Sequence, residues 1–139
     1  MRLVVCFMYT ETIIFGGWAL AGSISKIKWF KDNMDKWQGK RLAAFCVGGS
    51  PIENPEIEIA MKNWFKPEDN VQTFYCPGGF DYDKMSGGYK LMMKMFISTL
   101  KAKKDKTEAD EKQIQMLSSS YDISDYKYIE PIVKWVNEQ

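Results

Sequence analysis

The sequence predicts an α/β domain with a parallel sheet. Three short runs rich in β-branched and apolar residues alternate with segments of helical periodicity, and a glycine-rich stretch follows each run. This order is typical of βαβ units, whose right-handed crossovers make the strands parallel. A chain of 139 residues without an internal repeat or a domain-sized linker fits one domain, here residues 1–139, that needs no metal or disulfide to stay folded.

The first strand is predicted at about 12–16, where β-branched and aromatic residues precede Gly16-Gly17. A helix is predicted at about 23–37, with Ser23 as its N-cap and Gly39 closing it. Its apolar residues recur three or four positions apart, at Ile24, Ile27, Phe30, Met34 and Trp37.

The second strand is predicted at 41–47, where a continuous apolar run indicates burial on both faces. Asn54 and Pro55 supply an N-cap and a first-turn proline for a helix at about 55–66. The third strand is predicted at 71–76, before another proline-glycine turn.

The second half of the chain predicts two more helices. The first spans about 83–101, and its Met92–Met95 run is interpreted as core, with a flexible contact surface for a partner or a membrane as the alternative. The charged stretch 101–113 is expected to be a solvated helix end or a loop. In the last helix, at 126–137, Pro131 either introduces a kink or marks the true start.

Composition excludes several functions. Lys and Arg number 19 against 18 Asp and Glu, so the net charge of +1 gives no electrostatic argument for a nucleic-acid partner. The chain has no histidine, which excludes Ser/His/Asp and Cys/His nucleophilic sites and imidazole metal sites. Catalysis would have to use carboxylates, thiols, tyrosines or a cofactor, and the paired acids present are explained by solvated helix starts.

The cysteines and the N-terminus favour a cytoplasmic protein. Cys6, Cys46 and Cys76 are interpreted as buried thiols in a reducing compartment, and a Cys46–Cys76 disulfide would require neighbouring strands. The apolar start resembles a signal peptide, but residues 10–12 interrupt it with polar side chains. No stretch reaches the ~20 apolar residues of a transmembrane helix, which leaves peripheral membrane contact as an option.

Glycine-rich loops are expected at the carboxyl ends of the strands, at 16–22, 48–51 and 77–80. Ligands of open α/β sheets bind at that edge, and glycine lets a backbone approach a flat or phosphorylated ligand. Trp18, placed in the first loop, would stack on an aromatic ligand. The alternatives are tight turns that use glycine anyway and a tryptophan packed over the sheet edge.

Several motifs in order resemble the flavodoxin-domain family that includes the menaquinone-dependent protoporphyrinogen oxidases. The resemblance covers about residues 11–139 and is carried by Ile13-Ile14-Phe15-Gly16-Gly17-Trp18, Ala21-Gly22-Ser23-Ile24, Lys28-Trp29-Phe30, the run from Lys40 to Pro51, Pro77-Gly78-Gly79-Phe80-Asp81-Tyr82 and the helix with the Met-Met-Lys-Met run.

The resemblance implies a flavodoxin-like sheet with FMN at the carboxyl ends of the strands, and electron or hydride transfer through the flavin. Protoporphyrinogen as substrate and a quinone or a redox protein as partner follow from the same resemblance. It places Gly16, Gly17 and Trp18 in one flavin-contacting loop and Gly48, Gly49 and Ser50 in the other. It identifies no proton-transfer residue and no metal ligand.

The chain departs from this family at its start. Only eleven residues precede Thr12, and they contain no Ser/Thr/Gly-rich phosphate loop, so the flavodoxin-like domain is shortened at its N-terminus and FMN is expected to bind weakly or not at all. The alternative function is a non-enzymatic, shortened domain that binds little FMN and completes its sheet with a partner chain or with itself.

The strand at Thr12–Phe15 is interior in the family's sheet and here has lost a neighbour. An exposed apolar strand edge invites pairing and self-association. Three explanations remain open: Leu3–Met8 folds back as a hairpin, another chain covers the edge, or the coding sequence begins further upstream. The upstream explanation is favoured because the flavin-ring loops stay recognisable.

Overall fold

The computed structural model describes residues 11–138, and both Cys6 and the hairpin expected for Leu3–Met8 lie outside this range. The three predicted strands are present as β1 (Thr12–Leu20), β3 (Arg41–Gly48) and β4 (Val71–Pro77), and they run parallel in the order β1-β3-β4. A short strand, β2 (Ser23–Ile24), pairs antiparallel with the end of β1. The sheet is therefore mixed, and the prediction of a purely parallel sheet is wrong.

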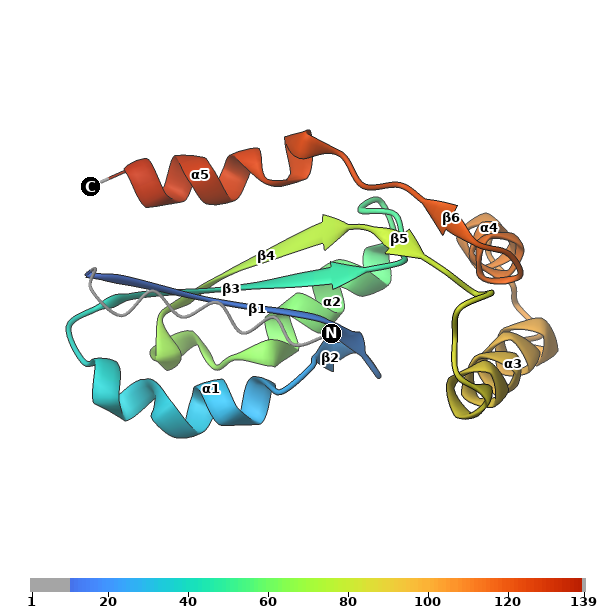
Figure 1. Cartoon of the computed structure of the whole chain (residues 1–139), viewed down its shortest axis with the longest axis horizontal. Helices are drawn as coiled ribbons and strands as arrows, with labels where there is room; N and C mark the ends of the chain where they lie inside the picture. The colour runs from blue at the N-terminus through green and yellow to red at the C-terminus, as the bar shows by residue number, and fades with distance from the viewer. Residues whose placement is uncertain (1–10, 139) are drawn as a thin grey trace.

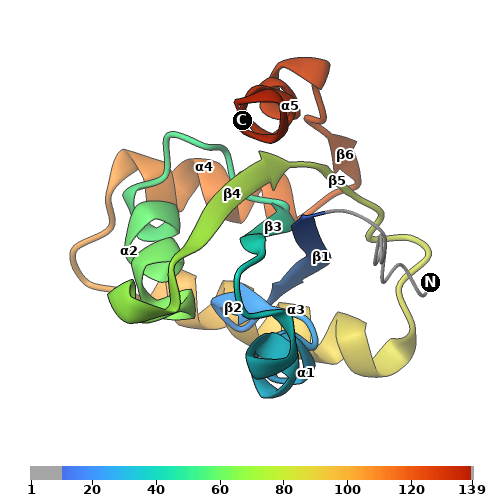
Figure 2. The same cartoon turned by 90° about the vertical axis from the view of Figure 1, so that its left-hand side faces the viewer.

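One face of the sheet carries the main core. Helices α1 (Ile27–Asn33) and α2 (Pro55–Trp64) lie against it, as Figures 1 and 2 show. Alternate strand residues point into this core, because successive side chains of a strand face opposite sides. At its centre Phe30 is fully buried and stacks on Phe15, with ring centroids 5.0 Å apart. The buried members of the cluster are Ile13, Phe15, Ile24, Phe30, Leu42, Ala44, Cys46, Trp64, Phe65 and Tyr75.

Strand β1 runs through Gly16-Gly17 instead of stopping there. Gly16 is paired in register with Phe45, and a Cβ on Gly16 would overlap the Phe45 ring. A Cβ on Gly17 would lie 2.8 Å from a methyl of Ile24 and 2.9 Å from the carbonyl oxygen of Ser25. Both glycines therefore serve close packing inside the strand, which the sequence pattern did not distinguish from a turn.

The helix expected from Ser23 begins only at Ile27. Ala21 and Gly22 adopt positive φ angles of 49° and 77°, and they turn the chain back so that Ser23 and Ile24 pair with the end of β1. The backbone N–H of Ser25 then donates to the carbonyl of Trp18 at 2.8 Å. Ser23 is thus a strand residue, and its predicted role as an N-cap is wrong.

The start of α2 confirms the prediction for Asn54 and Pro55. The side-chain oxygen of Asn54 accepts a hydrogen bond from the backbone N–H of Glu56 at 3.0 Å, and Pro55 occupies the first turn. This arrangement satisfies one of the free N–H groups that every helix start exposes.

The other face of the sheet carries α5 (Glu130–Asn137), which a single 3-10 turn at Tyr126–Tyr128 precedes. Pro131 lies in the first turn of α5, so it marks the helix start rather than a kink. Trp135 packs edge-on against Phe74 of β4, and the Arg41 guanidinium lies 4.2 Å from the centroid of the Trp135 ring. Arg41 also donates to the backbone carbonyl of Trp135, which fixes α5 over this face.

Two further helices, α3 (Gly87–Ala102) and α4 (Glu108–Leu117), form a small unit beside the carboxyl ends of the strands (Figure 1). Ile97, Leu100 and Leu117 form the centre of a separate buried cluster there. A two-residue ladder of β5 (Gly79–Phe80) and β6 (Tyr121–Asp122) joins this unit to β4. The stretch expected to be a solvated helix end or a loop thus contains a helix, α4.

The methionines of α3 differ from one another. Met93 packs against the small cluster, as the core interpretation predicts, whereas Met92 and Met95 are exposed. The core interpretation is therefore wrong for two of the three methionines in the Met92–Met95 run. The helix also starts four residues later than predicted, after Asp81 has capped a turn by accepting from the backbone N–H of Lys84.

The two cysteines of the described range are buried and free, as predicted. Strands β3 and β4 are neighbours, yet Cys46 lies opposite Tyr75 and Cys76 lies opposite Val47. The one-residue offset places the two thiols on opposite faces of the sheet, which explains why no disulfide joins them. The Cys76 thiol instead donates to the carbonyl of Tyr128 at 3.5 Å.

Candidate functional site

The carboxyl edge of β1, β3 and β4 brings the predicted site residues together. The register aligns Trp18 with Val47, and Val47 with Cys76, so that the ends of the three parallel strands lie side by side. Trp18 is 47% exposed and Val47 is 38% exposed. Trp18 belongs to β1 rather than to a loop, and its position in register beside Val47 makes an accessible apolar strip at this edge.

The loop Gly48-Gly49-Ser50 is held by side chains from two other strands and one helix. The Tyr75 hydroxyl donates to the carbonyl of Ser50 at 2.8 Å and accepts from the N–H of Ser50 at 3.1 Å. The Tyr121 hydroxyl of β6 donates to the carbonyl of Gly49 at 2.6 Å. Gln113 of α4 donates to the Ser50 hydroxyl at 3.2 Å. Every hydrogen bond in this set restricts the loop to one conformation.

The space beside the site glycines is occupied by the chain itself. A Cβ on Gly48 would lie 2.6 Å from the Tyr75 hydroxyl, and one on Gly49 would overlap the Tyr121 hydroxyl. The Ser50 N–H and hydroxyl, which an anionic ligand would use, already have protein partners. The exposed Trp18 therefore suits a flat aromatic ring, whereas the Gly48–Ser50 loop does not supply an anchor for a phosphate.

The titratable groups near this edge are protonated at neutral pH. Burial, with a smaller contribution from Cys76, raises the pKa of the Cys46 thiol to about 12. Burial also raises the pKa of the Cys76 thiol and of the Tyr75 and Tyr121 hydroxyls. Since the thiolate is the nucleophilic form of cysteine, neither buried thiol is suited to nucleophilic catalysis.

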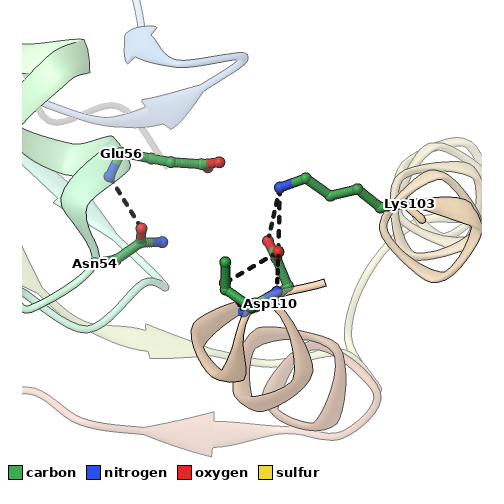
Figure 3. A network of polar contacts seen from close by, with 5 residues as sticks. Asn54, Glu56, Lys103 and Asp110 are labelled. Atoms are coloured by element: carbon green, nitrogen blue, oxygen red, sulfur yellow. Dashed lines mark hydrogen bonds and ion pairs between the residues drawn. The ribbon is translucent and has the colours of Figure 1, made fainter. Parts of the chain in front are cut away.

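The helix that supplies Gln113 is fixed at its start by a charged contact. Figure 3 shows Lys103, at the end of α3, reaching toward Asp110 on α4. The Lys103 ammonium lies 3.1 Å from a carboxylate oxygen of Asp110, which also accepts from the backbone N–H of Thr107 at 2.9 Å. Thr107 and Asp110 cap the helix reciprocally. This capping box therefore sets where α4 begins and how Gln113 faces the loop.

Acid is expected to loosen the α3–α4 unit. The hydrogen bond from the Thr107 backbone, and next the one from Lys103, lower the pKa of Asp110 below its usual value. A lowered folded-state pKa means that this stabilisation is complete above the unfolded pKa of about 4 and is lost as pH falls through the folded value. Thermal melting followed by circular dichroism from pH 7 to pH 3 should show a smaller acid-induced loss in Asp110→Asn than in the parent chain. An equal loss in both would contradict this assignment.

Sequence reasoning missed Tyr75, Gln113 and Tyr121, the residues that hold the loop. Tyr75 lay within a predicted strand, where its alternation with Phe74 gave no sign of a hydroxyl contact. The spacing of Thr107 and Asp110 is the one signal that would have predicted α4. The contacts of Gln113 and Tyr121 depend on tertiary structure alone.

A second hollow lies at the opposite, amino end of β3 and β4, with a volume of about 460 Å³. Arg41, Lys62, Phe65 and Trp135 are among its lining residues, but Arg41 is already engaged with Trp135 and Lys62 with Glu58. We place the candidate site at the carboxyl edge because the loops between the parallel strands and their crossovers meet there.

No family model, curated protein or solved structure matches this chain. None of the helices within residues 11–138 has the length and apolarity needed to cross a membrane.

Proposed function

We propose that this chain binds the ring system of FMN weakly at the carboxyl edge of β1 and β3, and acts in FMN-dependent electron or hydride transfer. The observation that carries the proposal is the accessible strip of Trp18 and Val47 at the end of parallel strands. When bound, the flavin would accept and pass on electrons or a hydride. Protoporphyrinogen as the substrate and a quinone as the acceptor belong to the proposal through the sequence resemblance.

The protein's own contribution to this function is binding and orientation. The Trp18 indole offers a flat face for stacking, and its backbone is fixed by the hydrogen bond that Ser25 donates to the Trp18 carbonyl. Tyr75, Tyr121 and Gln113 hold the adjacent loop rigid, so little conformational entropy would be lost when a ring docks against it. These features support recognition of the ring and leave the phosphate without an anchor in residues 11–138.

Replacing Trp18 with alanine should weaken flavin binding by about 5- to 150-fold, since stacking on an aromatic side chain contributes about 1–3 kcal/mol. Titration of the chain with FMN, followed by flavin fluorescence, measures this change. The matched control is Trp29→Ala, which removes a tryptophan of similar exposure from α1. Riboflavin should bind about as well as FMN, because the phosphate finds no nest of donors.

Three outcomes would contradict the proposal. Submicromolar affinity for FMN would mean that the chain does anchor the phosphate. Equal losses in the Trp18 and Trp29 variants would mean that the ring does not stack at the carboxyl edge. Absence of binding at millimolar flavin would favour the second candidate function.

The second candidate is a non-enzymatic domain that completes its sheet with a partner. Within residues 11–138, β2 pairs only with Ala19 and Leu20, and no other strand lies on that side of Ile13–Phe15. Helix α5 is the only helix of this range on the second face of the sheet, where Phe45 is half-buried and Val47 exposed. A chain that binds no flavin and dimerises in sedimentation equilibrium would support this candidate.

A further inference from the structure

Helix α3 exposes a continuous apolar surface. Leu91 and Met95 are 62% and 65% exposed, and Tyr89, Met92 and Phe96 are about half exposed. Leu91 with Met95, and Met92 with Phe96, are four residues apart, so each pair occupies adjacent turns on one side of the helix. We call these five residues the α3 apolar face.

The opposite side of the same helix is also apolar. Ile97 and Leu100 are buried against α4, and Met93 packs beside them. A helix on a protein surface normally turns a polar face to water, and one that is apolar on both sides is typical of a buried helix. The α3 apolar face is therefore a surface that a second apolar phase would cover.

The charge around this face narrows the choice of that phase. Residues 84–106 contain seven lysines and one aspartate, although the whole chain has a net charge of only +1. Lys94 and Lys101 are exposed and lie two helical turns apart, along one border of the apolar face. Lys104 and Lys106 follow directly after the helix. A strongly positive rim beside exposed Leu, Met and Phe side chains matches an anionic lipid surface.

We propose that α3 docks on anionic lipid bilayers, with the α3 apolar face entering the headgroup region and Lys94 and Lys101 contacting lipid phosphates. A second copy of the chain fits less well, because a two-fold contact through α3 would bring its own lysines together. A lipid surface also needs no shape complementarity to a single convex helix. The proposal is independent of the flavin site, which lies at the ends of β1 and β3.

Vesicle flotation of the full chain tests this. Vesicles of equal parts phosphatidylcholine and phosphatidylglycerol should bind the protein at low salt and release much of it at high salt, while vesicles of phosphatidylcholine alone should bind it weakly. Met95→Glu should weaken binding about tenfold or more, because it removes a side chain that would be buried. Lys94→Gln with Lys101→Gln should weaken binding to the anionic vesicles about 30-fold, since each lysine near an anionic surface contributes about fivefold.

Matched controls separate this surface from general changes in apolarity and charge. Ile59→Glu changes an equally exposed apolar residue on α2, and Lys28→Gln with Lys36→Gln removes two lysines near α1. Both controls should bind as the parent chain does. Failure of the parent chain to bind either vesicle would overturn the proposal, as would equal losses in the control variants. A dimer in solution that Met95→Glu dissociates would identify a second copy as the occupant and overturn it as well.

Discussion

Replacing Phe30 with alanine should lower the free energy of unfolding by about 3–5 kcal/mol, the range for truncating a fully buried aromatic side chain. Phe30 has no exposed surface and contacts three other rings. Its ring centroid lies 5.0 Å from Phe15, 5.2 Å from Trp37 and 5.8 Å from Phe65. The substitution therefore opens a cavity between α1, the sheet and the end of α2. Urea unfolding followed by circular dichroism measures the loss.

The matched control for this substitution is Phe96→Ala on α3. Phe96 is about half exposed, so its truncation should cost far less than that of Phe30. Equal losses in the two variants would mean that Phe30 is not the centre of the main core.

Gly16→Ala should destabilise the protein by about 1–3 kcal/mol, although alanine is usually tolerated in strands. The new Cβ would overlap the Phe45 ring, which lies directly across the strand pair from Gly16. The matched control is Gly88→Ala in α3, where no atom lies within 4 Å of the new Cβ. That control should stabilise the helix by up to about 1 kcal/mol, since alanine is the better helix former.

A second substitution identifies the ring as the cause. In the background Phe45→Ala, Gly16→Ala should cost much less, because the methyl group then enters the space that the ring left. Unfolding free energies of the two single variants and the double variant form a cycle whose coupling term measures the overlap. A coupling near zero would show that Gly16 is needed for another reason.

The main features of the sheet were predictable from local sequence. Apolar runs at 41–47 and 71–76 indicate buried strands, and Asn54-Pro55 indicates a helix start, because each depends on neighbouring residues alone. The path from Gly16 to Ile27 was not predictable. Its glycines, which look like a turn, are needed in a strand by the Phe45 ring and by Ile24, both distant in sequence.

The candidate site was predictable at the level of its edge. Trp18, Gly48 and Ser50 gather at the carboxyl ends of parallel strands because the strand order alone determines that meeting point. The side chains that hold the loop could not be predicted in the same way. Gln113 lies 63 positions from Ser50, and Tyr121 lies 72 positions from Gly49. The flavin itself stays a prediction from the resemblance.

The separation of the two buried clusters has a consequence for the candidate site. The cluster around Ile97 and Leu117 is small, so α3 and α4 form a unit that opens sub-globally at a lower free energy than the sheet. The loop at Gly49-Ser50 is held by both units, through Tyr75 from the sheet and through Gln113 from α4. Each opening of α3 and α4 releases one of these restraints and leaves the other, so the loop's local stability follows the weaker of the two foldons.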